Sequence, residues 1–522
     1  MSDALIQALQ NPELYDHPTG PFQVIETHIS RVLLTGDYAY KIKKAVDFGF
    51  LNFTTLEQRR HFCEEELRLN RRLAGDLYEA VVPITGSPEH PQLGGEGEPF
   101  EYAIRMRQFD QAQLLDQVNA NNALSVTHID ALADTLAHFH AKLPSVAADS
   151  PLGTPPEVLA PMLQNVEQIR PFLSEAADLA QLEQLEAWTQ DSFARLQALI
   201  AQRRVDGFVR ECHGDLHLGN ITLRDGQITI FDCIEFSDSF RWIDTFNDLA
   251  FLLMDLQDRD RKDLAWRLLN RYLENSGDYA GLPLLGLYIA YRALVRAKIA
   301  LFTRANPALS AADQDALLAR YRRYAILAEQ CSQVPRRALV VTSGVSGSGK
   351  SRLALTLAET FGGVRIRSDV ERKRLFGLQP LASSQNAGVD LYTPDANQRT
   401  YEKLATLARD ILAAGYSVAV DAACLRREER ARFVDVGEAQ AVPVLVLWCN
   451  ARRETLVQRL TERAARGDDP SEAGIDVMQR QLGWVEPLSD DEPLHTLQVQ
   501  TDEPGAVEAL LEELARLYDQ LA

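Results

Sequence analysis

The sequence predicts a multidomain chain, with an α+β part made of a small sheet and a helical lobe, followed by an α/β part. The chain has 522 residues, and because domains usually hold about 100–200 residues, one small fold is excluded. The opening segments alternate like strands, and later segments are mostly helical. The helical periodicity of residues 311–330 stops before Pro335, where a β-branched strand and a glycine-rich turn begin. We therefore expect the parts to be residues 1–335 and 336–522.

The composition is that of an ordinary globular protein. The chain is 46% hydrophobic and 25% charged, which excludes a wholly disordered protein. Its formal net charge is −20, and this disfavours general binding to nucleic acid, because neutralising phosphates requires a basic surface. The six cysteines form no C-x-x-C pair, so we expect reduced thiols rather than a disulfide framework or a zinc ribbon.

Two stretches bear on location. The first residues lack the basic start and apolar core of a secretory signal, which predicts a cytoplasmic protein. The most apolar window, residues 282–302, contains Arg292, Arg296 and Lys298. Because charged side chains are costly inside a bilayer, this window predicts a buried core helix and no association with a membrane.

The segment GVSGSGKS at residues 344–351 fits the pattern G-x-x-x-x-G-K-[ST] and lies between a predicted strand and a predicted helix. Its glycines allow backbone N–H groups to surround an anion, and the helix N-terminus adds partial positive charge. We expect Lys350 to reach the β and γ phosphates of a nucleotide and Ser351 to ligate Mg²⁺. The alternative is a glycine turn without a ligand. The expected nucleotide-binding residues are Gly344, Gly347, Ser348, Gly349, Lys350 and Ser351.

Residues further along favour phosphoryl transfer. Asp369 follows the next predicted strand and is placed to accept a hydroxyl proton, while Arg372 is placed to hold an acceptor or a phosphate. The alternative is that Asp369 caps a helix. Asp421 ends another buried strand and suits either Mg²⁺, through water, or the acceptor. Arg459 and Arg463 recur at helical spacing and form either a lid over phosphates or a solvated face paired with glutamates.

Four segments carry a resemblance to a known group of enzymes: GVSGSGKS, SDVERKRLFG, VAVDAACL and LTERAARGDDPSEA. They resemble the small P-loop kinases that include polynucleotide kinases and zeta-toxin-like kinases, over most of residues 336–522. The resemblance implies a parallel sheet flanked by helices, with Asp369 as base and Arg372 on the acceptor side. It also implies that Arg459 or Arg463 faces the phosphates. No N-K-x-D motif follows the third strand, which disfavours a GTPase switch.

A second site is indicated by HGD at residues 213–215, followed by Asn220 and by a strand that leads into Asp232. The spacing matches H-x-D-x-x-x-x-N of kinase catalytic loops, with a metal-binding aspartate on the next hairpin. One carboxylate must meet the acceptor hydroxyl while an amide oxygen and a second carboxylate hold Mg²⁺. We therefore expect Asp215 to act as base and Asn220 and Asp232 to bind the metal. A zinc site at the nearby histidines is disfavoured, and His213 is expected to orient the loop.

Upstream, the stretch YAYK ends at Lys41 and is similar to the V-A-I-K strand of kinases, where strand alternation turns the lysine toward the nucleotide. The alternative is a solvent-facing basic strand end that includes Lys43. The expected partner of Lys41 is Glu66 on the next helix, because apolar residues three and seven positions later anchor that face to the core. Glu64, Glu65 and an unpaired surface glutamate remain alternatives.

Residues 20–330 resemble the aminoglycoside phosphotransferase-like branch of the protein-kinase-like fold, whose loop commonly reads HGD-x-x-x-x-N. The resemblance implies a bilobal fold and phosphoryl transfer from ATP. Two departures disfavour a protein kinase: no G-x-G-x-x-G loop precedes Lys41, and Cys233 and Ile234 replace the expected Phe-Gly. Asp244 and Asp248, after the metal-binding hairpin, look like the family's structural acids that anchor the helical lobe.

The sequence thus predicts a cytoplasmic two-module kinase in which each module uses MgATP to phosphorylate a hydroxyl group. The expected acceptor is a small molecule, and nucleic acid is not expected. Two other functions stay open: a regulatory switch in which one module gates the other, and a polynucleotide kinase that processes nucleic-acid ends. The sequence specifies neither the acceptor nor the oligomeric state.

Overall fold

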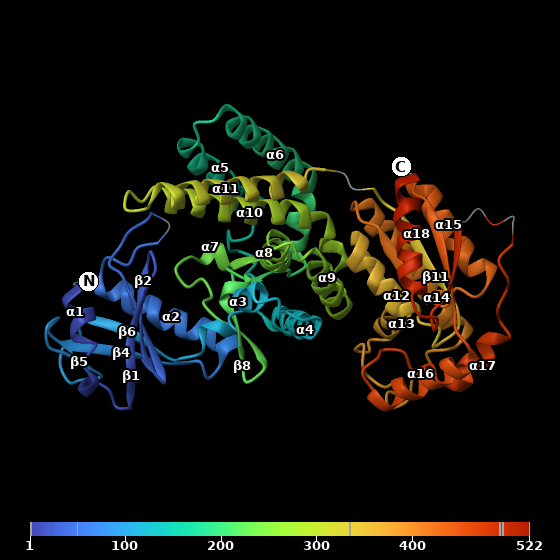
Figure 1. Ribbon diagram of the computed structural model, residues 1–522, viewed down its shortest axis with the longest axis horizontal. Helices are drawn as coiled ribbons and strands as arrows, with labels where there is room; N and C mark the ends of the chain where they lie inside the picture. The colour runs from blue at the N-terminus through green and yellow to red at the C-terminus, as the bar shows by residue number, and fades with distance from the viewer. Residues whose placement is uncertain (1–2, 50, 334–335, 490–491, 493–494, 521–522) are drawn as a thin grey trace. The chain divides into compact units, whose positions relative to one another are not determined.

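The computed structural model describes residues 3–49, 51–333, 336–489, 492 and 495–520 (Figure 1). The chain forms two compact units, and neither unit is one continuous stretch of sequence. Pro335, where we expect the boundary, lies outside the described residues, and the division into residues 1–335 and 336–522 stays a prediction. The first unit comprises residues up to 128, residues 139–255 and residues 291–318, and the second comprises residues 129–138, residues 256–290 and residues from 319 onward.

The first unit contains a six-stranded antiparallel sheet with the order β1-β2-β3-β6-β4-β5. Helix α2 packs against β4 and β6 (Figure 1), and it begins at a capping box formed by Thr55 and Gln58. Of the strands, β4 and β5 were not predicted. The bounds are α1 Asp3–Ala8, β1 Thr19–Glu26, β2 Ser30–Gly36, β3 Tyr38–Lys43, α2 Leu56–Ala74, β4 Tyr78–Gly86, β5 Pro91–Leu93 and β6 Glu101–Arg107.

The helical lobe carries the second predicted motif on two small antiparallel sheets, β7 with β10 and β8 with β9. The HGD segment lies between β7 and β8, and Asp232 follows β9. Helix α10 is the predicted core helix, and none of the described helices is both long and apolar enough to cross a bilayer. The bounds are α3 Leu115–Ala120, α4 Val126–Lys142, α5 Pro155–Ile169, α6 Ala176–Val205, β7 Val209–Glu211, β8 Ile221–Arg224, β9 Gln227–Ile230, α7 Asp238–Arg241, β10 Trp242–Asp244, α8 Thr245–Asp258 and α10 Leu282–Arg304.

The second unit is built on a five-stranded parallel sheet with the order β12-β13-β11-β14-β15. Its helices enclose a core that includes Val340, Leu353 and Leu447. Because parallel strands end at one edge, the segments after β11, β12 and β13 meet there. The bounds are α9 Lys262–Ser276, α11 Ala311–Gln330, β11 Leu339–Ser343, α12 Lys350–Leu357, the π-helix η6 Ala358–Gly362, β12 Val364–Arg367, α13 Ser368–Leu375, α14 Pro394–Ala413, β13 Val418–Asp421, α15 Arg427–Gln440, β14 Val444–Asn450, α16 Arg453–Arg466, α17 Ile475–Leu482, β15 His495–Gln500 and α18 Ala506–Gln520.

These two architectures confirm the predicted fold class: a sheet followed by a helical lobe, and a parallel sheet flanked by helices. Helix α11 begins and ends at the residues where the periodicity predicted it.

Candidate active sites

In the first unit, the structure brings Lys41 together with two acidic residues. The Lys41 ammonium on β3 donates to Glu66 Oε1 at 2.7 Å and to Asp232 Oδ1 at 2.6 Å. Glu66 is fully buried on α2, and Asp232 has a left-handed backbone with φ of 64°. The alternatives Glu64 and Glu65 pair instead with arginines of their own helix. Glu66 is therefore the glutamate that contacts Lys41.

A second lysine, Lys43, shares the same carboxylate. Its ammonium donates to Glu66 Oε2 at 2.6 Å and also contacts Glu235, and its side chain is buried, so the alternative of a solvent-facing strand end does not hold. Burial raises the pKa of Glu66, but Lys41 and Lys43 outweigh it and hold this pKa below its ordinary value. Lys43 lies two residues after Lys41 and therefore on the same strand face, so a second buried lysine could be expected there. Its other partner, Glu235, carries no such signal in the sequence.

The HGD loop is held by the carboxylate of Asp248. The Asp248 carboxylate accepts the backbone N–H groups of His213 at 3.0 Å and Gly214 at 2.8 Å, and it lies 3.2 Å from Nε2 of His140. Burial raises the pKa of Asp248, but the hydrogen bond and charge of His140 outweigh it and bring the pKa to about 2. Gly214 has φ of 87°, and a Cβ there would lie 2.8 Å from the Phe240 carbonyl oxygen, so glycine is required.

Asp215 and Asn220 are in direct contact. The Asn220 amide donates to the Asp215 carbonyl at 2.9 Å and to its Oδ2 at 3.1 Å. The Asn220 carbonyl accepts the N–H of Phe231, which precedes Asp232. Burial raises the pKa of Asp215, but the charge and hydrogen bond of His217 outweigh it, so this pKa lies below its ordinary value. Carboxylate and amide oxygens are ligands that Mg²⁺ prefers, and the side chains of Asn220 and Asp232 are of these two kinds.

In the second unit, the loop between β11 and α12 has the backbone that a phosphate-binding loop requires. Gly344 and Gly349 have φ of 147° and 92°. A Cβ at Gly344 would lie 2.4 Å from the carbonyl oxygen of Cys449, so a larger residue would push the loop away from β14. The Lys350 ammonium donates to the carbonyl of Val345 at 2.8 Å.

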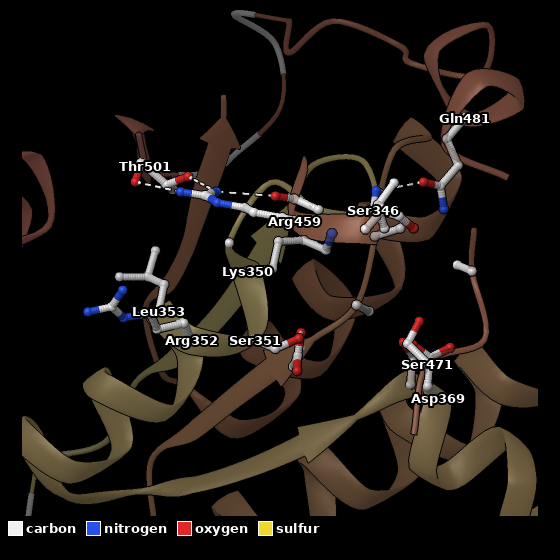
Figure 2. Close-up of a pocket in the computed structure, with 18 of the residues that line it drawn as sticks. Ser346, Lys350, Ser351, Arg352, Leu353, Asp369, Arg459, Ser471, Gln481 and Thr501 are labelled. Atoms are coloured by element: carbon white, nitrogen blue, oxygen red, sulfur yellow. Dashed lines mark hydrogen bonds between the residues drawn. The ribbon is translucent and has the colours of Figure 1, made fainter. Parts of the chain in front are cut away.

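A cavity of about 740 Å³ opens at this loop, within the size range of small-molecule sites. Figure 2 shows Lys350 and Ser351 at the start of α12, with Asp369 on a separate helix across the pocket. Gly344 and Ser348 are buried and are not part of the described cavity wall. The predicted residues that line the cavity are Gly347, Gly349, Lys350, Ser351, Asp369, Arg372, Asp421, Arg459 and Arg463.

Ser351 and Asp421 form the polar floor of this cavity. The Ser351 hydroxyl donates to Asp421 Oδ1 at 3.0 Å, and the Nε of Arg367 lies 3.3 Å from Asp421 Oδ2. Arg367 also pairs with Asp469 at 3.2 Å. A hydroxyl beside a carboxylate is a donor set that suits Mg²⁺. Arg367 belongs to no recognisable motif, although an arginine in a buried strand is itself a signal of a charged partner.

Asp369 and Arg372 lie one helical turn apart on α13. The helix cap is Arg367, so Asp369 is not the capping residue. Arg372 is 6% exposed, and its guanidinium donates to the Leu391 carbonyl at 3.1 Å and to Asn397 Oδ1 at 3.3 Å. Across the residues that the structure describes, Arg372 forms no ion pair. A buried cation without a carboxylate partner thus borders the cavity.

The two candidate lid arginines contact backbone carbonyls and a threonine hydroxyl rather than glutamates. The Arg459 guanidinium donates to the Gly347 carbonyl at 3.2 Å and to Thr501 Oγ1 at 2.8 Å, and Arg463 donates to the Ala473 carbonyl. Arg459 therefore touches the phosphate-binding loop itself. The alternative of a face paired with neighbouring glutamates is not what the described residues of α16 form.

Two further groups contact the loop from distant parts of the chain. Gln481 on α17 accepts the N–H of Ser346 at 2.7 Å (Figure 2), and Thr501 donates to the Ser348 carbonyl at 2.8 Å. Neither residue belongs to a motif, so the sequence carries no local signal for them.

Two family models match the chain. Residues 52–285 match the model described as "Phosphotransferase enzyme family", and residues 339–488 match the model described as "AAA domain". The first unit has the protein-kinase-like fold of the aminoglycoside phosphotransferases, and the second has a P-loop kinase fold. The protein is an ATP-dependent kinase with two kinase-like domains.

Curated relatives extend this match to most of the chain. Uncharacterized protein Rv2004c of Mycobacterium tuberculosis is 31% identical over 469 residues, which cover 89% of this chain and 91% of the relative. Uncharacterized protein Mb2027c of Mycobacterium bovis gives the same values. The chain belongs to the same family as these mycobacterial relatives. Within this chain, the phosphotransferase-family match precedes the AAA-domain match.

Two solved structures illustrate the likeness, and each covers part of this chain. A choline/ethanolamine kinase family protein from Mesorhizobium loti covers 63% of this chain and 98% of its own, with 15% identity and a TM-score of 0.38. A gluconokinase from Sinorhizobium meliloti 1021 covers 36% of this chain and 97% of its own, with 22% identity and a TM-score of 0.27.

Proposed function

We propose that the chain is a bifunctional phosphotransferase in which each module transfers the γ-phosphoryl group of ATP to a hydroxyl group. One observation supports this above all others. Each unit gathers a lysine, carboxylates, and other oxygen ligands of the kind that Mg²⁺ prefers. The proposal covers the modules of residues 1–335 and 336–522.

In the first module, Lys41 contacts the nucleotide phosphates and Glu66 holds it in place. Asn220 and Asp232 bind Mg²⁺, which, when present, neutralises charge on the phosphates. Asp215 orients the acceptor hydroxyl and takes its proton. The pKa of Asp215 lies below its ordinary value, because His217 outweighs burial, so this carboxylate is ionised at neutral pH and can accept the hydroxyl's hydrogen bond.

In the second module, Lys350 and the loop N–H groups hold the β and γ phosphates, and Ser351 and Asp421 hold Mg²⁺. Asp369 accepts the proton of the hydroxyl, and Arg372 binds the acceptor. Because Arg372 is buried without an ion pair among the described residues, an anionic or strongly polar group on the ligand would stabilise it. Arg459 and Arg463 face the phosphates as they transfer.

The acceptor of the second module is a small molecule. The cavity of about 740 Å³ supports this assignment, because it is of the size that holds a nucleotide fragment and a compact acceptor. The formal net charge of −20 argues against a nucleic-acid acceptor.

The test uses the full chain with Asp215→Asn and Asp369→Asn, each incubated with γ-labelled ATP and a metabolite extract. Each substitution should reduce the labelled product of its own module at least about 100-fold and leave the product of the other module unchanged. Exposed aspartates of the same units supply matched controls, Asp225→Asn and Asp395→Asn. If one substitution alters no product, that module does not transfer phosphate and the regulatory switch gains support. Label on oligonucleotide 5′ ends would identify a polynucleotide kinase instead.

A further inference from the structure

Strand β12 is at the edge of the parallel sheet, and a side chain from α9 covers it. The sheet order places β12 last, beside β13, and an edge strand leaves backbone groups without strand partners. Asn270 of α9 makes two hydrogen bonds to the backbone along this edge. Its amide donates to the Gly363 carbonyl at 2.9 Å, and its Oδ1 accepts the Arg365 N–H at 2.6 Å.

Glu274 lies one helical turn after Asn270 and is buried against the same strand. Its carboxylate contacts the guanidinium of Arg365 and lies 3.7 Å from that of Arg367. Arg365 and Arg367 are two residues apart on β12, so both turn to one face. Burial raises the pKa of Glu274, but the two arginines outweigh it and hold the pKa below its ordinary value. The carboxylate is therefore charged and compensates two buried cations.

Both arginines contact the floor of the cavity. Arg365 donates to the Ser351 carbonyl at 3.0 Å, and Arg367 lies 3.3 Å from Asp421 Oδ2. The other Asp421 oxygen accepts the Ser351 hydroxyl. Glu274 is therefore linked through Arg367 to the Asp421 carboxylate and through Arg365 to the backbone carbonyl of Ser351, whose hydroxyl is bonded to Asp421.

We propose that Glu274 is a positioning residue for the metal-binding pair of the second module, and that α9 completes this kinase site. The proposal rests on the proposed function of Ser351 and Asp421. Glu274 shares the positive charge of Arg367, so Asp421 is not bound by the full charge of that guanidinium and stays available to a metal ion. Helix α9 lies within residues 52–285, which match the phosphotransferase model, so the P-loop site depends on a segment that precedes its own family match.

The consequence is specific to the metal. Without the Glu274 carboxylate, Arg367 loses one of its three acidic contacts and interacts more strongly with Asp421, in direct competition with Mg²⁺. Nucleotide binding through Lys350 and the loop N–H groups does not pass through Asp421. A positioning role therefore predicts loss of the part of nucleotide affinity that magnesium adds, and not of the rest.

The experiment measures binding of a non-hydrolysable ATP analogue by calorimetry, with and without Mg²⁺, in the full chain carrying Lys41→Ala to remove the first site. We expect Glu274→Gln to reduce the affinity gained on adding Mg²⁺ by about tenfold and to leave the affinity in EDTA within about twofold. The matched control is Glu359→Gln, which breaks the ion pair of Glu359 with Arg267, a residue of α9 like Glu274. It should leave the affinity gained on adding Mg²⁺, here called the magnesium gain, unchanged.

Glu274→Asp is the second variant, because it keeps the charge and is expected to fold even if Glu274→Gln does not. In Glu274→Asp, the affinity gained on adding Mg²⁺ should be about threefold smaller than in the parent chain. A full magnesium gain in a folded Glu274 variant would overturn the proposal, and so would an equal loss of affinity with and without Mg²⁺. Lys350→Met in the same background separates the two proposals: if it still binds the analogue, the proposed function of the P-loop site is wrong.

Discussion

The two lysines assigned to ATP occupy opposite electrostatic surroundings. Lys41 contacts two carboxylates, whereas Lys350 donates to a backbone carbonyl and forms no ion pair with the residues that the structure describes. Burial lowers the pKa of Lys41, but Asp232 and Glu66 outweigh it and raise it well above its ordinary value. Burial also lowers the pKa of Lys350, and here the attraction of Asp421 does not compensate.

The difference lies in where the charge that compensates each buried cation comes from. The first unit balances its buried charges within the protein, through Glu66, Asp232 and Glu235. The second unit leaves Lys350 and Arg372 without carboxylate partners among the described residues, so under the proposed function the compensating charge would come from the ligand. Substitutions at the first site should therefore reduce stability, and substitutions at the second should reduce ligand affinity.

The largest effect is expected for Glu66→Ala, which leaves Lys41 and Lys43 buried without their shared carboxylate. Breaking a buried ion pair from one side costs about 3–5 kcal/mol, so the opening free energy of β3 and α2 should fall by about that amount. Native-state hydrogen exchange measures this locally. The control Glu64→Ala is exposed on the same helix and should change it by less than about 0.5 kcal/mol. Equal losses for both variants would contradict the comparison.

Next in size is Lys350→Met, which tests the opposite expectation. Removing this ammonium should weaken binding of an ATP analogue at the second site by about 100-fold, because the phosphates lose their main cationic partner. The thermal unfolding temperature of the second unit should not fall, since no carboxylate in the described structure depends on Lys350. Calorimetry measures the affinity, and a thermal scan of the same variant measures the unfolding temperature. A lower unfolding temperature without weaker binding would contradict the contrast between the two lysines.

A pH-dependent effect is expected at Asp248 of the first unit. Its pKa is about 2 in the folded chain, below the ordinary value of 3.8, because His140 outweighs burial. A depressed carboxyl pKa contributes stability that is present above about pH 4 and is lost as the pH falls through 2. The gap in unfolding free energy between the wild type and Asp248→Asn should shrink by about 2 kcal/mol between pH 4 and pH 2. Urea unfolding measures this difference in free energy. A difference that stays constant between pH 4 and pH 2 would show that the charge of Asp248 does not contribute to stability.

The smallest effect is expected for Gln481→Ala. Because the Ser346 N–H donates to Gln481, a phosphate oxygen must replace that acceptor, and one neutral hydrogen bond contributes about 0.5–1.5 kcal/mol. The affinity of the second site for the ATP analogue should rise about threefold. Gln479→Ala, which is exposed on the same helix, should not change it. A loss of affinity in Gln481→Ala would mean that the amide binds the ligand itself.

Much of the fold could be predicted because its signals are local. The glycine pattern at residues 344–351 and the periodicity of residues 311–330 depend on neighbours in the chain. Strand β4 was missed because its pairing with β6 includes a register shift, and its burial follows no simple alternation. Asn270 and Glu274 carry no local signal, since their roles depend on β12, some 90 positions later in the chain.

The candidate sites follow the same rule. Motif spacing identified Lys41, Asp215 and Lys350, because catalytic loops fix their residues at short range. Glu235 and Arg367 were not predicted, because their roles depend on their burial and on their interaction partners. A single sequence shows neither burial nor partners directly. Sequence reasoning thus predicted the residues proposed to bind the ligand, and the structure added the charged side chains that contact them.

The most direct test of the account counts nucleotide sites in the full chain. Calorimetry with a non-hydrolysable ATP analogue and Mg²⁺ should give two binding events per chain in the wild type, one in Lys350→Met and one in Lys41→Ala. The double variant should bind none. A single binding event in the wild type, or one lost by both single variants together, would contradict the claim that this chain holds two separate ATP sites.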